Sequence, residues 1–205
     1  MSARRNSRWQ QRQDRDPYVR MARRDGWRSR AVYKLQQLDE KEHLLQPDMT
    51  CVDLGAAPGS WSQYLSYRLK GRVRLIALDL LAMDALPSVE YIQGDFTEKA
   101  VLMRLLDSLD ESKADLVLSD MAPNISGSKA IDQPKSMYLA ELALDLARQV
   151  LRHHGSFICK VFQGQGCEAF LKDVRTTFDQ ARLVKPKASR AGSSEVYLVA
   201  RNYQL

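Results

Sequence analysis

One short segment, residues 51–61, constrains the fold more than any other part of the chain. It reads Cys-Val-Asp-Leu-Gly-Ala-Ala-Pro-Gly-Ser-Trp, an apolar run with an acidic residue that breaks into a loop of small residues. A helical pattern starts at about Ser60. This order predicts a strand, a tight glycine turn and a helix, which together let a backbone approach a nucleotide-like ligand closely. The dinucleotide fingerprint G-x-G-x-x-G is not matched, because its second and third glycines are missing.

Strand-like and helical patterns alternate through most of the chain. The strand-like runs are 51–54, 73–78, 89–92, 116–118 and 156–161. The helical patterns are 60–69, 98–109, 134–151 and 167–178, after an earlier one that follows residue 28. Such alternation predicts an α/β fold with a parallel sheet and helices on both faces. Two final strands, 182–185 and 195–200, have no helix between them, so we expect them to pair antiparallel.

Polar residues stand where the predicted strands end, which is where such sheets bind their ligands. Asp79 closes the second strand, roughly twenty residues after the glycine loop, where a carboxylate for ribose hydroxyls is expected. Asp95 follows the third strand and suits an adenine amino group, although taken alone it is more typical of a helix N-terminus. Asp120 follows the fourth strand, and Lys160 lies near the end of the fifth.

The net charge of +6 is concentrated at one end of the chain. Residues 1–30 hold ten arginines and three aspartates, a charge of +7, which leaves −1 for the rest. We therefore expect a basic arm, residues 1–28, followed by a single domain, residues 29–205. Arginines bind phosphate, and the interleaved Trp9, Tyr18 and Trp27 suit stacking on unpaired bases. The arm thus predicts a nucleic-acid partner, with a solvated tail as the alternative and docking onto the domain as the alternative for Trp27.

Several classes of protein are disfavoured by composition. No apolar run is long enough to cross a bilayer, and the arginine-rich start lacks the apolar core of a secretory signal. The three cysteines lack C-x-x-C spacing, which favours reduced thiols in a cytoplasm. The three histidines have no partners at zinc spacing, so we expect no metal. We expect a cytoplasmic monomer without membrane contact.

Further motifs occur in order along the chain. They are Arg-Ser-Arg-Ala-Val-Tyr-Lys-Leu at 28–35, Gly-Asp-Phe at 94–96, Ser-Asp-Met-Ala-Pro-Asn at 119–124, Lys-Val-Phe-Gln-Gly at 160–164 and Ser-Glu-Val-Tyr at 194–197. Together with the glycine loop, they make residues 18–200 resemble the FtsJ/RrmJ (RlmE) family of RNA ribose 2′-O-methyltransferases.

The resemblance implies a fold, a cofactor and a substrate. The fold is the Rossmann-like fold of methyltransferases that use S-adenosylmethionine (SAM), a mostly parallel seven-stranded sheet with an antiparallel terminal strand. The substrate is a uridine ribose of 23S rRNA in the large ribosomal subunit. The implied SAM-binding residues are Gly55, Gly59, Trp61, Asp79, Asp95 and Asp120. The implied catalytic tetrad is Lys34, Asp120, Lys160 and Glu195.

One residue departs from the family pattern, since Ser60 stands where the bacterial loop usually has a second glycine. We expect its hydroxyl to cap the following helix.

Elementary chemistry supports the same tetrad. Methyl transfer to a ribose hydroxyl requires an in-line nucleophile, removal of a proton and positioning. A lysine is a poor base at its reference pKa of about 10.4; a second lysine nearby favours the neutral amine, whereas carboxylates oppose it. We expect Lys160 to be the base, because it sits in an otherwise apolar strand. We expect Asp120 to orient it, and Lys34 and Glu195 to position the ribose and the lysine.

Two other methylation reactions are disfavoured by the sequence. Base N-methylation is disfavoured, because residues 121–124 lack the aromatic residue of the Asn/Asp-Pro-Pro-aromatic pattern. A cytosine C5 enzyme needs a cysteine nucleophile, and Cys159 faces away from the side that Lys160 occupies. Two alternatives stay open: a methyltransferase for a tRNA anticodon-loop ribose, and a non-catalytic RNA-binding ribosome-assembly factor on the same scaffold.

Overall fold

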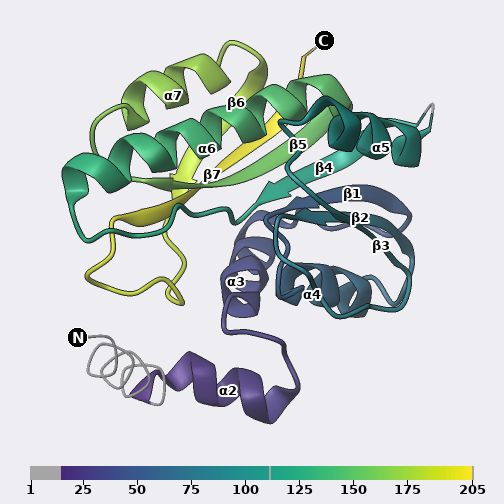
Figure 1. The fold of residues 1–205 in the computed structure, drawn as a ribbon, viewed down its shortest axis with the longest axis horizontal. Helices are drawn as coiled ribbons and strands as arrows, with labels where there is room; N and C mark the ends of the chain where they lie inside the picture. The colour runs from purple at the N-terminus through teal and green to yellow at the C-terminus, as the bar shows by residue number, and fades with distance from the viewer. Residues whose placement is uncertain (1–14, 111, 205) are drawn as a thin grey trace.

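The computed structural model describes residues 15–110 and 112–204, and a seven-stranded sheet forms its centre (Figure 1). The strands lie in the order β3-β2-β1-β4-β5-β7-β6. Their bounds are β1 (Met49–Leu54), β2 (Val73–Asp79), β3 (Val89–Gln93), β4 (Ala114–Ser119), β5 (Leu151–Phe162), β6 (Phe178–Val184) and β7 (Glu195–Tyr203). β1 to β5 pair in parallel, whereas β7 is antiparallel to both β5 and β6. The α/β fold and the antiparallel ending predicted from the sequence are confirmed.

Helices cover both faces of this sheet (Figure 1). One face is covered by α3 (Val32–Glu42) and α4 (Ser60–Arg68), and the other by α5 (Lys99–Leu109), α6 (Lys129–Val150) and α7 (Cys167–Val174). The remaining helix, α2 (Pro17–Asp25), lies away from the sheet (Figure 1). Alternate residues of a strand point to opposite faces, so Cys51 joins a buried cluster with α3 and α4, and Val52 joins the cluster with α5, α6 and α7. The two apolar clusters hold the sheet from both sides and leave its carboxyl edge free for a site.

Two helix boundaries differ from the sequence prediction. α6 begins at Lys129, with Pro134 inside the helix, because the Asp132 carboxylate accepts hydrogen bonds from the backbone of the loop just before it. α7 ends at Val174, and Phe178 belongs to β6 instead. Phe178 is buried in the core, so tertiary packing overrides the local helical pattern.

The described part of the arm is folded against the domain. Asp16 caps α2 and is paired with Arg30, whose guanidinium also donates to the carbonyl of Ala188. The Trp27 ring meets the rings of Tyr64 and Tyr67 at centroid distances of 6.1 and 5.5 Å. Trp27 therefore packs on α4, which was the alternative to stacking on RNA. Residues 1–14, which include Trp9 and four of the arm's arginines, lie outside the described residues.

Candidate active site and relatives

The glycine loop after β1 is held in a conformation that only glycine adopts easily. Gly55 has φ +71° and Gly59 has φ +100°. A Cβ atom on Gly55 would lie 2.6 Å from Cγ of Met121 and 3.2 Å from its Cα, in the loop after β4. The left-handed backbone and this close approach both require glycine. The loop thus brings the carboxyl ends of β1 and β4 together.

Two predicted carboxylates lie at neighbouring strand ends. Oδ2 of Asp79 accepts from the backbone N–H of Ala57 at 2.9 Å, and its Oδ1 accepts from Leu81 at 2.8 Å. Asp79 therefore ties the glycine loop to the end of β2. Asp95 accepts from the backbone and hydroxyl of Thr97 at 2.9 and 2.7 Å. Both carboxylates are half-buried at the ligand-binding edge of the sheet.

Ser60 and Trp61 play parts that differ from the simplest expectation. The predicted cap by Ser60 is wrong, because Gly59 occupies the N-cap position of α4 and no side chain caps it. The Ser60 hydroxyl instead lies 2.5 Å from the hydroxyl of Ser29, so it joins α4 to the segment before α3. The Trp61 indole is buried and donates to the carbonyl of Ala31 at 2.9 Å.

Arg28 is a structural residue that sequence reasoning missed. Its guanidinium donates to the carbonyls of Pro58, Asp84 and Ala85 at 2.9, 2.7 and 2.9 Å. These bonds join the end of the arm to the glycine loop and to the loop between β2 and β3. An arginine in a basic arm carries no sequence signal for such a role.

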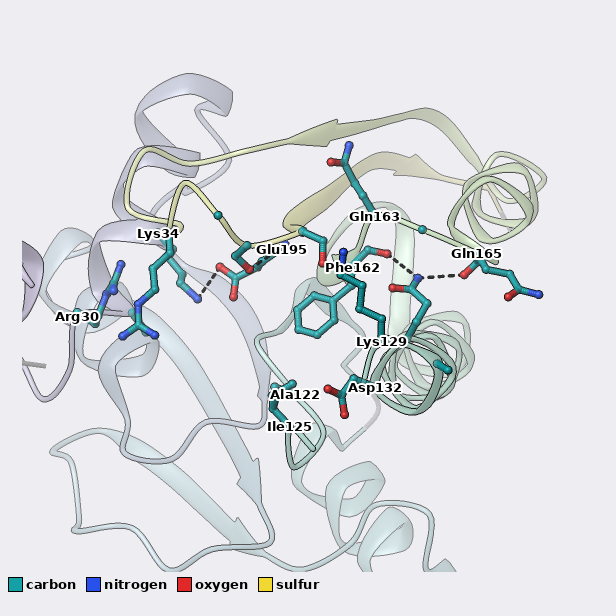
Figure 2. A pocket seen from close by; sticks show the side chains of 18 of the residues that line it. Arg30, Lys34, Ala122, Ile125, Lys129, Asp132, Phe162, Gln163, Gln165 and Glu195 are labelled. Atoms are coloured by element: carbon teal, nitrogen blue, oxygen red, sulfur yellow. Dashed lines mark hydrogen bonds and ion pairs between the residues drawn. The ribbon is translucent and has the colours of Figure 1, made fainter. Parts of the chain in front are cut away.

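The four tetrad residues come together from α3, β5, β7 and the position directly after β4. Nζ of Lys160 lies 3.0 Å from Oδ1 of Asp120 and 2.5 Å from its backbone oxygen. Nζ of Lys34 lies 3.8 Å from the same Oδ1 and 2.8 Å from Oε1 of Glu195. The Lys34–Glu195 pair borders a cavity (Figure 2). Glu195 is thus paired with Lys34, and Asp120 joins the two lysines.

Tyr197 is a fifth member of this cluster that the sequence analysis did not single out. Its hydroxyl donates to Oδ1 of Asp120 at 2.5 Å, and its ring lies 5.6 Å from Nζ of Lys34. Burial and the charge of Asp120 raise its pKa well above the ordinary value, so the phenol stays protonated and donates. The signal was the period of two along β7, which places Tyr197 on the same face as Glu195.

The cluster favours an ionised Asp120. Burial by itself would raise the pKa of Asp120, but the charges of Lys160 and Lys34 and the Tyr197 hydrogen bond hold it below the usual value. The side chain is 17% exposed, so a ligand can reach it. Together with Glu195, the centre holds two lysines and two carboxylates.

Beside this centre lies a cavity of about 850 Å³. Its walls are the starts of α3 and α6, the loop from β4 to α6, the loop from β5 to α7 and the loop from β6 to β7. Figure 2 shows the Phe162 ring inside it, between the Lys34–Glu195 pair and Lys129. Cavities of this size hold small-molecule-sized ligands, so one unit of a polymer can enter.

The residues at this edge do not favour a cysteine nucleophile or a bound metal ion. Cys159 is buried in the core, and burial raises the pKa of its thiol to about 12, which disfavours a nucleophilic thiolate. Across residues 15–110 and 112–204, no three His, Cys, Asp or Glu side chains gather in a way that would hold a metal ion. In the same ranges, no helix has the length and hydropathy that a membrane crossing requires.

Asp53, beneath the glycine loop, is a buried carboxyl with an unusual pKa. Burial raises the pKa of Asp53 to about 7, against the hydrogen bond that Ser62 donates to Oδ2 at 2.7 Å. Its Oδ1 has no hydrogen-bond partner among the described residues. The unfolded chain loses this proton near pH 4. The folded state therefore holds a proton that the unfolded state lacks between about pH 4 and about pH 7, and stability falls as pH rises through that window.

Asp53→Asn should remove this contribution. Between about pH 4.5 and about pH 8, the unfolding free energy of the wild type should fall by roughly 2–4 kcal/mol more than that of the variant, because each tenfold change in acid strength is worth about 1.4 kcal/mol. Urea unfolding at several pH values measures this difference. Ser62→Ala is the control, since it keeps the carboxyl. Parallel pH profiles for Asp53→Asn and the wild type would contradict the assignment.

The sheet order, the glycine turn and the carboxylates at the strand ends define the class of Rossmann-like methyltransferases. Comparison with known proteins narrows the class. The family model described as FtsJ-like methyltransferase matches residues 27–203. The chain belongs to this family, and the Rossmann-like fold and methyl-donor chemistry follow from that membership.

Relatives match over nearly the full chain. A protein of Pseudomonas aeruginosa strain PAO1, named ribosomal RNA large subunit methyltransferase E, is 54% identical over 97% of this chain and 96% of its own. A protein of the same name from Pseudomonas fluorescens is 52% identical over 96% and 94%. A crystal structure described as a ribosomal RNA methyltransferase from Plasmodium falciparum superposes with a TM-score of 0.78 and 32% identity, covering 86% of this chain and 98% of that one.

Proposed function

We propose that this chain transfers a methyl group from SAM to the ribose 2′-hydroxyl of a nucleotide in RNA, specifically a uridine of 23S rRNA in the large ribosomal subunit. The observation that carries the proposal is the Lys34–Asp120–Lys160–Glu195 cluster beside an open cavity at the ligand-binding edge of a methyltransferase sheet. The names of the relatives support the choice of RNA. We infer a cytoplasmic location, because the proposed partner is the ribosomal subunit, and we propose that the chain acts as a monomer.

The residues at this edge fit SAM. The cofactor offers ribose hydroxyls, an adenine amino group, an ammonium and a sulfonium, which are donors and cations. Three carboxylates, Asp79, Asp95 and Asp120, stand at successive strand ends to accept them. At Gly55 a side chain would collide with Met121, so the loop stays free of bulk beside these carboxylates. When bound, SAM supplies an electrophilic methyl group.

The chain's own residues then provide the base and the positioning of the ribose that the reaction requires. Lys160 is the base that removes the proton from the 2′-hydroxyl, and Asp120 holds its Nζ in place. Tyr197 donates to the same carboxylate oxygen and so keeps Asp120 oriented. Lys34, held by Glu195 at the cavity wall, positions the ribose. With SAM bound, the methyl group would leave its sulfur for the 2′-oxygen, and the proton of the hydroxyl would pass to Nζ of Lys160.

Asp79→Ala should weaken SAM binding by about 10-fold or more, because a hydrogen bond to a charged group contributes about 1.5–3 kcal/mol. Calorimetry with purified protein measures the affinity. Asp48→Ala is the control, because Asp48 lies just before β1, at the opposite end of that strand from the glycine loop. Its exposed carboxylate is paired with Arg72, and its N–H donates to the Arg72 carbonyl. Absence of SAM binding by the wild type would overturn the cofactor assignment, and binding abolished by a chelator would contradict the expectation that no metal is required.

The function itself is tested by transfer of labelled methyl from SAM. Unmethylated large ribosomal subunits and bulk tRNA are offered separately, and the modified ribose is then mapped. Label on a 23S uridine ribose supports the proposal, and label on tRNA alone assigns the tRNA alternative. RNA binding without label on either substrate assigns the non-catalytic alternative.

A further inference from the structure

Phe162 differs from every other phenylalanine of the chain, all of which are described. Four phenylalanines lie in, or pack against, one buried apolar cluster, and they are Phe96, Phe157, Phe170 and Phe178. Phe162 is half-buried and belongs to neither cluster. Its ring points into the cavity beside the tetrad (Figure 2). Packing of the core therefore does not explain why an aromatic ring stands there.

The backbone places this ring next to the reacting groups. Phe162 follows Lys160 by two residues on β5, so both side chains point to the same face, about 6–7 Å apart along the strand. In the register with β7, Phe162 lies opposite Glu195 and Lys160 lies opposite Tyr197. The ring is thus one step along the strand from the base and beside the Lys34–Glu195 pair.

The segment that carries the ring is held by α6. Nε2 of Gln133 donates to the carbonyl of Phe162 at 2.8 Å and to that of Gln165 at 2.9 Å. These two bonds fix the backbone on both sides of the exposed Gly164 (Figure 2). A ring on a backbone held in this way is oriented before a ligand arrives, which lowers the entropy cost of binding.

The cavity also has the charge that a nucleotide requires. Lys129, from the start of α6, and Arg190, from the β6–β7 loop, are exposed on different walls of the cavity. Cations at the rim suit phosphates, and an aromatic ring in the interior suits a base, since base–aromatic stacking contributes about 1–3 kcal/mol per base.

We propose that Phe162 is the stacking platform for the base of the nucleotide whose ribose is methylated. This inference rests on the proposed function, and it adds a base-binding subsite to the ribose-binding tetrad. A base stacked on Phe162 places its own ribose towards Lys160 and Lys34. Because every base has a π-face, the subsite accepts any base, and the surrounding RNA structure selects the nucleotide.

Substitutions that separate stacking from filling of space test the proposal. Single-turnover transfer is measured across concentrations of unmethylated large ribosomal subunits with saturating SAM. Phe162→Leu keeps an apolar side chain without a ring. It should raise the half-saturating RNA concentration or lower the rate, so that the rate divided by this concentration falls about 10-fold or more. Phe162→Trp keeps a stacking face and should stay within about 3-fold of the wild type. SAM affinity should be unchanged in both.

Tyr138→Leu is the matched control, because it removes an exposed aromatic ring on α6 that does not line the cavity. It should have little effect. Wild-type rates in Phe162→Leu, or equal losses in the leucine and tryptophan variants, would overturn the subsite.

A second measurement distinguishes failure of the Phe162 subsite from failure of the proposed function. Binding of a single-stranded oligouridylate without SAM should weaken in Phe162→Leu and persist in Phe162→Trp. Phe162-dependent binding by a wild type that transfers no methyl would support the subsite and reject the enzyme. Normal transfer by Phe162→Leu, with binding unaffected, would leave the enzyme and reject the subsite.

Discussion

Lys160→Ala should abolish methyl transfer, with a fall of about 10²–10⁴-fold or more in the single-turnover rate, because the group that takes the ribose proton is removed. The fold and SAM binding should persist, since the glycine loop and Asp79 lie on other strands. The wild-type rate should rise with pH, because general-base catalysis requires a neutral amine on Lys160. Transfer to ribosomal subunits across pH, with SAM affinity measured in parallel, provides the data.

Two further variants sharpen this result. Lys160→Arg keeps the charge but never deprotonates in proteins, so it should be inactive at every pH. Lys160→Met keeps much of the stem without the amine, and it replaces the alanine variant should that variant fail to fold. Near-normal rates in Lys160→Met would reject the base and leave positioning by Asp120 and Lys34 as the mechanism.

Asp120→Ala should be nearly as severe for activity and should also destabilise the fold. Its carboxylate accepts from Tyr197 and is paired with both lysines. Removing one partner from a buried ionic cluster costs about 3–5 kcal/mol. Asp120→Asn keeps the shape and loses only the charge, so it should retain more stability and little activity.

The pH dependence of the Asp120 effect has a definite sign. Because the pKa of Asp120 is lowered in the folded state, its stabilising contribution is present above the pKa of the unfolded chain and is lost as pH falls through the lowered value. Denaturant unfolding of wild type and Asp120→Asn should therefore differ most at neutral pH and converge in acid.

Glu195→Ala is the comparison for activity, and its loss should be milder because Glu195 contacts Lys34 and not Lys160. Equal losses of activity in Asp120→Ala and Glu195→Ala would contradict the central place of Asp120.

Much of the ligand-binding edge was open to prediction because its signals are local. The glycine loop, the strand–helix alternation and the residues at strand ends all follow from periodicity and from the conformations that glycine permits. Since parallel strands end on the same edge of a sheet, the order of residues along the chain suffices to place Asp79, Asp95 and Asp120 there. Lys160 stood out because it interrupts an apolar strand.

The sequence by itself determined the elements and the strand-end residues, whereas the tertiary structure decided which distant segments meet. β7 lies between β5 and β6, and only that order brings Tyr197 to Asp120 and Glu195 to Lys34. Neither contact is specified by residues near it in the chain, because strand order depends on packing over the whole sheet. The same reason explains Arg28, whose carbonyl partners lie 30 or more positions away. Local pattern specifies what each segment is, and burial of the two apolar clusters specifies where it lies.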